Sequence, residues 1–237
     1  MSSIWAITLK ELKTYFVSPI AYIITAMFLM ISGYFYSLIL SMTKDAGMMT
    51  YLFGNMSVIL LLICPLLSMR LFAEEDRNHT RELLVTSPIT DAGIVLGKFL
   101  ASAILLLLML ATTLHFPVLL FVFGNPDLYP ILSGYLGIFL MGCAFLAIGM
   151  LTSTWTQNQI IAAVSAFSIS LMLWFLGASG SVTSSELGKI LSYLSLNTHY
   201  ESFAKGLISL SDLLYYLSII GILLFMTVRS LETRRWR

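Results

Sequence analysis

Six long apolar segments constrain the fold of this chain more than any other feature of its sequence. A helix needs roughly 20 apolar residues to cross a hydrocarbon core of about 30 Å. We expect membrane spans at about residues 18–42, 48–72, 94–123, 129–152, 159–177 and 213–228. Because lipid offers no hydrogen-bonding partner to free backbone groups, the spans are predicted to be helices. The sequence therefore predicts an all-α membrane protein with six transmembrane helices in a single domain, residues 1–237.

The composition agrees with a protein that lies mostly within a membrane. Hydrophobic residues make up 58% of the chain and charged residues 11%, whereas about 25% of the residues of a soluble domain are charged. An ordinary soluble domain is therefore excluded. The formal net charge of +1 also argues against nucleic-acid binding, which requires a strongly basic surface.

The distribution of Lys and Arg predicts the orientation of the spans. Basic residues concentrate in the cytoplasmic segments of membrane proteins. Ten of the 13 fall on the side of the two termini: Lys10, Lys13, Arg70, Arg77, Arg81, Lys98, Arg229, Arg234, Arg235 and Arg237. Lys44, Lys189 and Lys205 fall on the opposite side. We therefore expect a multi-pass protein of a bacterial-type inner (plasma) membrane, with both termini in the cytoplasm.

Residues 1–17 are predicted to form an interfacial helix before the first span. The apolar residues that recur there at helical spacing are Ile4, Trp5, Leu9, Leu12 and Phe16. Lys10, Lys13 and Thr14 stand between them. Such an amphipathic helix would lie on the inner leaflet of the membrane. A frayed cytoplasmic tail with chance periodicity is the alternative.

Residues 178–212, between spans five and six, are predicted to form short extracytoplasmic helices. Two apolar stripes at helical spacing indicate them: Leu187, Ile190, Leu191 and Leu194, then Phe203, Leu207, Ile208 and Leu210. A disordered loop is disfavoured because the segment is apolar and has few helix breakers. Among its polar residues, His199, Glu201 and Asp212 are expected to be helix caps and surface groups rather than catalytic groups.

A charged insert between spans two and three carries the clearest functional signal. Residues 73–84 gather acidic and basic side chains in a chain that has few of either, and Ser87-Pro88 closes the insert. Asn78 can cap a short helix that begins near His79. We name residues 73–93 the coupling loop and predict that it is a docking surface for a soluble partner. A solvated charged loop without a partner is the alternative.

Within the spans, hydroxyl groups and small residues are further candidates. Ser165, Ser168 and Ser170 are candidates for lining a pathway, although a Ser in a helix often bonds its own backbone. Small residues spaced four apart in spans four and five allow close helix packing, either within one subunit or across a dimer interface. Cys64 and Cys143 are expected to be core residues rather than a disulfide or a metal pair.

The sequence predicts no enzymatic activity in the chain itself. Gly93 and Gly97-Lys98 resemble a phosphate-binding loop, but only three residues separate the glycines and Phe99 follows the lysine. A P-loop has four intervening residues and then Ser or Thr after its lysine. His115 has no second His, Asp or Glu near it in its span, so no metal site is predicted. The spans also lack the paired acids or Ser-His pair that an intramembrane enzyme would need.

Short motifs in a fixed order lie mostly outside the spans. They are Lys10-Glu11-Leu12 with Ser18-Pro19, Met69-Arg70, Ala73-Glu74-Glu75, Thr80, Glu82-Leu83-Leu84, Ser87-Pro88-Ile89, Gly97-Lys98, Asn197-Thr198-His199-Tyr200, Phe203, Gly206, Asp212 and Tyr215-Tyr216. With these motifs the chain resembles the permease subunits of ATP-binding-cassette exporters of the second class, and within that class the gliding-motility-type permeases. The order and spacing of the motifs within six spans carry the resemblance.

The resemblance implies a permease that works as a dimer, with identical or different subunits. Two cytoplasmic P-loop ATPases would bind ATP and Mg and grip the coupling loops; this chain itself would need no cofactor. The implied ATPase contacts are Glu74, Glu75, Arg77, Thr80, Arg81, Glu82, Leu83 and Leu84. His199, Phe203, Gly206 and Asp212 would form the extracytoplasmic motif.

Further partners implied are membrane lipid and an extracytoplasmic accessory protein. The alternative to substrate export is an ATPase-linked membrane machine of the gliding-motility type, which does assembly or mechanical work.

Overall fold

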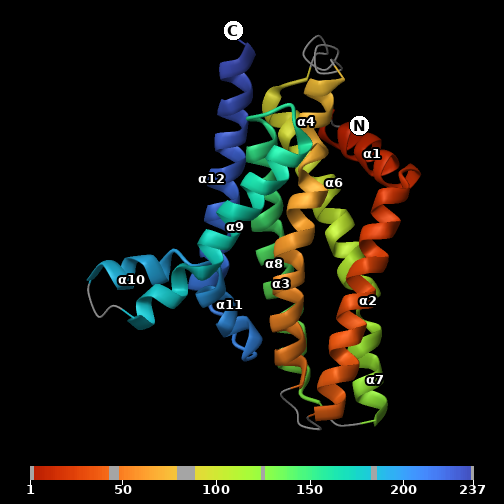
Figure 1. Ribbon diagram of the computed structural model, residues 1–237, viewed down its shortest axis with the longest axis vertical. Coiled ribbons are helices and arrows are strands. Elements are labelled where there is room, and N and C mark those ends of the chain that lie inside the picture. The colour runs from red at the N-terminus through yellow and green to blue at the C-terminus, as the bar shows by residue number, and fades with distance from the viewer. Residues whose placement is uncertain (1–2, 43–47, 79–88, 124–125, 183–185, 236–237) are drawn as a thin grey trace.

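The computed structural model describes residues 3–42, 48–78, 89–123, 126–182 and 186–235. Within these residues the chain is helical and contains no strand. The helices are α1 (Ser3–Val17), α2 (Pro19–Met42), α3 (Met48–Ser68), α4 (Arg70–Arg77), α6 (Asp91–Thr112), α7 (His115–Phe123), α8 (Leu128–Ser153), α9 (Gln159–Val182), α10 (Glu186–Tyr193), α11 (Leu196–Ala204) and α12 (Leu210–Arg235). Figure 1 shows an elongated bundle in which the amino and carboxyl ends lie at the same end.

Among the residues that the structure describes, six helical segments are long and apolar enough to cross a membrane, which confirms the predicted spans. They are Pro19–Met42, Met48–Arg77, Asp91–Val122, Leu128–Ser153, Gln159–Gly177 and Leu210–Thr233. The second span continues beyond its predicted end through α4. The acidic start of the coupling loop is therefore helical and is an extension of that span.

The second and fourth spans form the centre of the bundle, where α3 packs along α8 (Figure 1). We compared an 18-residue apolar window of each span. Within the chain, 72% of this window is buried in the second span and 78% in the fourth, against 17% in the fifth. α8 also contacts α6, α9, α11 and α12. The fifth span, formed by α9, therefore presents most of its apolar surface outward.

Small residues let α8 approach its neighbours closely. A Cβ atom on Gly149 would overlap the hydroxyl of Ser68 in α3, and one on Gly142 would lie 2.6 Å from Cδ2 of Leu106 in α6. The other small residues of the pattern that are buried within the chain are Ser133, Gly137, Ser153, Ala162, Ala166 and Ser170. The small residues thus serve packing within one subunit, which confirms the first of the two interpretations of this pattern.

The third span is interrupted, whereas the sequence predicted one unbroken helix over residues 94–123. Pro117 has no N–H group, and in a continuous helix that group would donate to the carbonyl of Thr113 four residues earlier. The helix breaks at residues 113–114. The hydroxyl of Tyr135 in α8 donates to the Thr113 carbonyl at 3.0 Å. The Phe116 N–H also donates to this carbonyl, at 3.0 Å. The turn at the break and the neighbouring helix α8 therefore share the backbone acceptor that the proline cannot serve.

The predicted amino-terminal helix is present as α1 and packs against α6. The face that it buries comprises Ile7, Thr8, Glu11 and Tyr15. Three of the apolar residues that predicted the helix, Trp5, Leu9 and Phe16, are exposed instead. A helix that packs on the protein through one face and exposes apolar side chains on another has the pattern of an interfacial helix.

Two short helices, α10 and α11, lie between spans five and six as predicted. Figure 1 shows both beside the bundle, not beyond its end. The second predicted stripe does not form one helix, because only Phe203 lies in α11, Leu207 and Ile208 are not helical and Leu210 begins α12. Gly206 ends α11 with φ of 86°, a left-handed conformation that favours glycine. The Gly206 N–H donates to Phe203 O, and the Leu207 N–H donates to Ser202 O. This hydrogen-bonding pattern is the Schellman motif that commonly ends helices.

Candidate functional site

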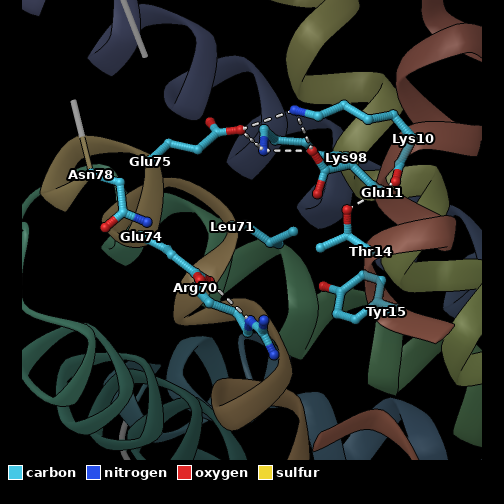
Figure 2. A pocket seen from close by; sticks show the side chains of 10 residues that line it. All are labelled: Lys10, Glu11, Thr14, Tyr15, Arg70, Leu71, Glu74, Glu75, Asn78 and Lys98. Atoms are coloured by element: carbon cyan, nitrogen blue, oxygen red, sulfur yellow. Dashed lines mark hydrogen bonds and ion pairs between the residues drawn. The ribbon is translucent and has the colours of Figure 1, made fainter. Parts of the chain in front are cut away.

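A fully buried lysine, Lys98, joins three helices at the base of the coupling loop. Its side chain is 1% exposed. Its Nζ atom lies 2.7 Å from Oε1 of Glu75 in α4 and 3.1 Å from Oε1 of Glu11 in α1. Figure 2 shows the three side chains pointing toward one another from separate helices. A single ammonium group therefore ties α1 and α4 to α6.

A second lysine completes a balanced set of charges. Nζ of Lys10 lies 3.6 Å from Oε1 of Glu11 and 3.8 Å from Oε1 of Glu75. Lys10 is more than half exposed, whereas the side chains of Glu11 and Glu75 are 11% and 14% exposed. We call Lys10, Glu11, Glu75 and Lys98 the ionic cluster. Buried charges are tolerated when they are paired, and removing one partner leaves the other uncompensated.

Close packing of α1 on α6 brings Glu11 to Lys98. A Cβ atom on Gly97 would lie 2.8 Å from Cβ of Ile7, so only a glycine permits this approach. The hydroxyl of Thr8 donates to the Gly97 carbonyl at 3.1 Å. Glu11 lies about one helical turn beyond Thr8, on the same buried face of α1.

The start of α6 is fixed by its own cap. The Thr90 side chain accepts a hydrogen bond from the Gly93 N–H, and Asp91 lies in the first turn. Such a cap satisfies one of the free N–H groups at the helix start. Lys98 follows about two turns later, where α6 enters the bundle. The coupling loop therefore leads into a helix whose first turns are already anchored.

A second ion pair and a tyrosine lie next to the ionic cluster. Nε of Arg70 donates to Oε2 of Glu74 at 3.1 Å, within α4. The Tyr15 hydroxyl donates to Leu67 O at 3.3 Å. Burial raises the pKa of the Tyr15 phenol, Glu11 and Glu74 raise it further, and Arg70 opposes them. Tyr15 therefore stays a neutral hydroxyl that holds α1 to the end of α3.

These groups line a pocket of about 260 Å³ (Figure 2). Its lining residues are Lys10, Glu11, Thr14, Tyr15, Arg70, Leu71, Glu74, Glu75, Asn78 and Lys98. In the described part of the chain, no group of three or more His, Cys, Asp or Glu side chains could hold a metal ion. The described chemistry is that of ion pairs between helices, so the arrangement is suited to a mechanical joint.

The structure places the acidic residues of the coupling loop differently from the expectation. Glu74, Glu75 and Asp76 were expected to precede a helix, but they lie inside α4. Asp76 is buried, and the carboxylates of Glu74 and Glu75 are engaged by Arg70 and Lys98. These acids therefore stabilise the base of the loop through contacts within the chain.

The remaining predicted coupling residues are divided between two regions. Arg77, the last residue of α4, is exposed. The expected helix from His79 to Val85 lies outside the described residues. So do the other predicted contacts: Thr80, Arg81, Glu82, Leu83 and Leu84.

The three candidate pathway serines lie on α9 but in different surroundings. Ser165 donates to Ile161 O and Ser168 donates to Val164 O, each within its own helix. Ser168 is exposed, whereas Ser170 is fully buried. No described group accepts or donates a hydrogen bond at the Ser170 hydroxyl. The serines therefore do not form one polar stripe.

The motif that was expected on the extracytoplasmic side is assembled in the tertiary structure. His199 and Asp212 were expected to be caps and surface groups, but they are 6% and 7% exposed and contact each other. Burial follows because α11 packs between α8, α9 and α12. Phe203 is fully buried in α11, and Gly206 ends that helix.

Three other residues noted in the sequence have structural roles. His115 is exposed, and its Nδ1 lies 2.7 Å from Thr112 O at the break in the third span. Cys64 and Cys143 are free and buried. The expectation that the two cysteines are core residues is confirmed.

The central role of Lys98 was not predicted from the sequence. Its neighbourhood resembled an imperfect P-loop, and its charge was assigned to the cytoplasmic side of the membrane. The available signal was its position at the start of an apolar span, where a buried cation needs an anionic partner. Identifying Glu11 and Glu75 as the partners required the packing of α1 and α4.

Comparison with protein families identifies one match that covers most of the chain. Residues 37–230 match the family model described as ABC-2 family transporter protein. The match runs from within α2 to within α12 and includes Glu75 and Lys98. Glu11 precedes the matched segment. No curated protein matches the chain.

Proposed function

The chain belongs to the ABC-2 family of transporter proteins, and we propose that it is the permease subunit of an exporter driven by a separate cytoplasmic ATPase. As a member of this family with six apolar spans, it is a multi-pass membrane component. The ATPase subunits would bind ATP and Mg. The coupling loop would receive their movement and pass it to the spans.

The ionic cluster is the observation that carries this proposal. The coupling loop begins within α4, which ends at Arg77, and reaches into α6, which begins at Asp91. Lys98 in α6 is paired with Glu75 in α4, so both ends of the loop are tied together. The contact of Lys98 with Glu11 adds α1. We call this connection of α1, α4 and α6 through the ionic cluster the joint. A displacement of the loop would therefore move α1, α4 and α6 together.

The joint has direct connections to the first three spans. α4 continues the helix of the second span, and α6 begins the third. Only Ser18 separates α1 from α2, the first span. Because buried ion pairs resist separation, we expect these helices to respond as a unit. The remaining spans would follow through their packing on α8.

Within the coupling loop, we propose a division of labour. Glu74 and Glu75 hold the base of the loop through Arg70 and Lys98. Arg77 is exposed at the end of α4. The residues that contact the ATPase would be Arg77 and the segment containing Thr80, Arg81, Glu82, Leu83 and Leu84.

A dimer of permeases would enclose the pathway. α9 supports this proposal because only 17% of the most apolar window of its span is buried within the chain. Ser165, Ser168 and Ser170 lie on the same helix and would contribute polar groups near the pathway. Both termini would face the cytoplasm of a bacterial-type inner membrane, and an accessory protein would bind from outside. The second subunit would be either a copy of this chain or a related permease.

The central test separates ATPase binding from transmission. In one variant, a Gly-Ser linker of equal length replaces residues 79–86. In the other, Lys98→Met removes the joint. The linker variant should lose the ATPase that co-purifies with tagged wild-type permease. The Lys98→Met variant, compared with wild type at equal amounts of folded protein, should keep the ATPase but lose ATP-driven movement of substrate in vesicles.

Two results would contradict the proposal. Retention of the ATPase by the linker variant, at unchanged yield, would place the contact elsewhere. Full transport by the Lys98→Met variant would show that the ionic cluster transmits nothing. If wild-type vesicles hydrolyse ATP but move no lipid, lipid-linked glycan, peptide or drug, assembly or mechanical work of the gliding-motility type would replace export.

A further inference from the structure

A buried histidine and aspartate join α11 to the start of α12. Nδ1 of His199 lies 2.6 Å from Oδ1 of Asp212, and Nε2 of His199 lies 2.9 Å from the carbonyl oxygen of Tyr193. Both side chains are less than a tenth exposed. His199 lies in the segment between spans five and six and Asp212 at the start of the sixth, in a different part of the chain from the ionic cluster.

The hydrogen-bonding partners of this pair fix its number of protons. A neutral imidazole has one N–H donor and one acceptor nitrogen. The Tyr193 carbonyl can only accept, so Nε2 of His199 must carry a proton. An ionised Asp212 can also only accept, and it would then require a second proton on Nδ1. Both contacts are satisfied only when the pair holds one proton more than a neutral histidine and an ionised aspartate together.

That proton has two possible places. It can lie on Nδ1, giving an imidazolium and a carboxylate, or on Asp212, whose O–H then donates to Nδ1. Without it, a nitrogen lone pair faces an oxygen lone pair at one of the two contacts. Buried polar groups left in that state are costly because water cannot replace the missing partner.

We infer that His199 and Asp212 hold one shared proton that fastens α11 to α12. We call this contact the latch, and we infer that it opens when the proton is lost. This inference is independent of the proposed coupling to an ATPase. It assigns a proton-binding site to residues that the sequence analysis expected to be surface groups.

The groups around the pair do not supply another charge to replace the proton. The Tyr215 ring stacks on the His199 ring with centroids 3.7 Å apart, and the Tyr193 ring meets it edge-on at 5.1 Å. On α11, Glu201 and Lys205 are exposed and paired with each other. α9 has no ionisable side chain, and Lys189 of α10 is exposed.

Other hydrogen bonds hold the same region without a titratable proton. The Tyr215 hydroxyl donates to Leu194 O and the Tyr216 hydroxyl donates to Leu196 O. On the other side of α11, Ser133 donates to the Phe203 carbonyl. Tyr215 and Tyr216 lie in α12, so their bonds also hold the start of α11 to α12. Opening would therefore be confined to the contact of His199 with Asp212 and would leave the bundle folded.

Asp212→Asn is the matched control. The carboxamide of Asn can donate a hydrogen bond to Nδ1 while neutral His199 donates from Nε2 to Tyr193. The variant keeps both contacts without the extra proton. The latch should then remain closed over the whole pH range in which histidine titrates.

The first experiment counts protons directly. Nitrogen NMR of the full chain in lipid nanodiscs, with His79 and His115 replaced by Gln, reports on His199 alone. We expect protons on both ring nitrogens, or a proton on Nε2 together with the infrared band of a protonated carboxyl. A neutral His199 with bare Nε2 beside an ionised Asp212 would overturn the inference, and this result needs no variant at position 212.

The second experiment measures opening. Hydrogen exchange of residues 189–204 is compared in wild type and Asp212→Asn between about pH 6 and about pH 9, each after correction for intrinsic exchange. Exchange of the wild type should rise by roughly tenfold or more relative to the variant, since an unpaired buried group is strongly unfavourable. Equal pH dependence in the two proteins would contradict the latch.

Discussion

Nζ of Lys98 lies 3.1 Å from Oε1 of Glu11, although 87 residues separate the two in the sequence. The contact joins an amphipathic helix outside the spans to the first turns of the third span. It is also the point at which the coupling loop is anchored. The stability of the protein and its proposed coupling therefore depend on the same buried charge.

Lys98→Met should destabilise the protein strongly. The change leaves Glu11 and Glu75 without their buried cation, and loss of one partner of such a pair costs about 3–5 kcal/mol. Unfolding of the purified permease in mixed detergent micelles measures the effect. Lys10→Met is the control, because this exposed lysine should contribute less than about 1 kcal/mol. Equal stability of the two variants would contradict the assignment of Lys98 as the central charge.

Gly149→Ala should destabilise the contact between α3 and α8. The added methyl group would overlap the Ser68 hydroxyl and lie 2.8 Å from Ser68 Cβ, and overpacking of this kind costs typically about 1–3 kcal/mol. Adding Ser68→Gly should restore much of the loss. Gly221→Ala is the control, since no atom lies within 4 Å of its new Cβ. Thermal unfolding midpoints of the variants would show whether the two helices approach as described.

Tyr135→Phe should weaken the protein by about 1 kcal/mol, the typical contribution of one hydrogen bond. The lost hydroxyl donates to the Thr113 carbonyl, which Pro117 cannot serve and which the Phe116 N–H also serves. In a Pro117→Ala background, the new N–H group can serve this carbonyl. The effect of Tyr135→Phe should therefore shrink there. A double-mutant cycle on unfolding free energies measures the coupling between the two positions. Additive effects of the two substitutions would show that the Tyr135 hydroxyl does not act at the proline break.

Cysteine labelling tests the predicted orientation. Cys64 and Cys143 are buried, so they give little background. Asp127 precedes α8 and Thr233 lies near the end of α12; both are exposed. The distribution of Lys and Arg predicts that Asp127→Cys reacts with an impermeant maleimide in intact spheroplasts, and that Thr233→Cys reacts only after permeabilisation. The reverse pattern would place the coupling loop outside the cell.

The spans could be predicted because their signal is local. An apolar stretch of sufficient length marks a membrane helix wherever its neighbours lie. The break in the third span also had a local cause, Pro117, but the sequence alone did not show that Tyr135 would satisfy the freed carbonyl. The helices α1 and α10 followed from the spacing of apolar residues in the same way, whereas only Phe203 of the second predicted stripe lies in α11.

The side-chain partners could not be predicted in this manner. Glu74 and Glu75 looked like surface acids because a charged segment usually faces water. Their positions are decided by Arg70 within the same helix and by Lys98 on another. His199 and Asp212 likewise looked like surface groups until the packing of α11 against α12 enclosed them.

The sequence by itself determined the membrane class, the six spans and the membership of the chain in a transporter family, because hydropathy and motif order are properties of contiguous residues. Only the tertiary structure decided which charges meet. Lys98 pairs with Glu11 and Glu75, and His199 pairs with Asp212, because helix packing brings these distant residues together in surroundings from which water is excluded.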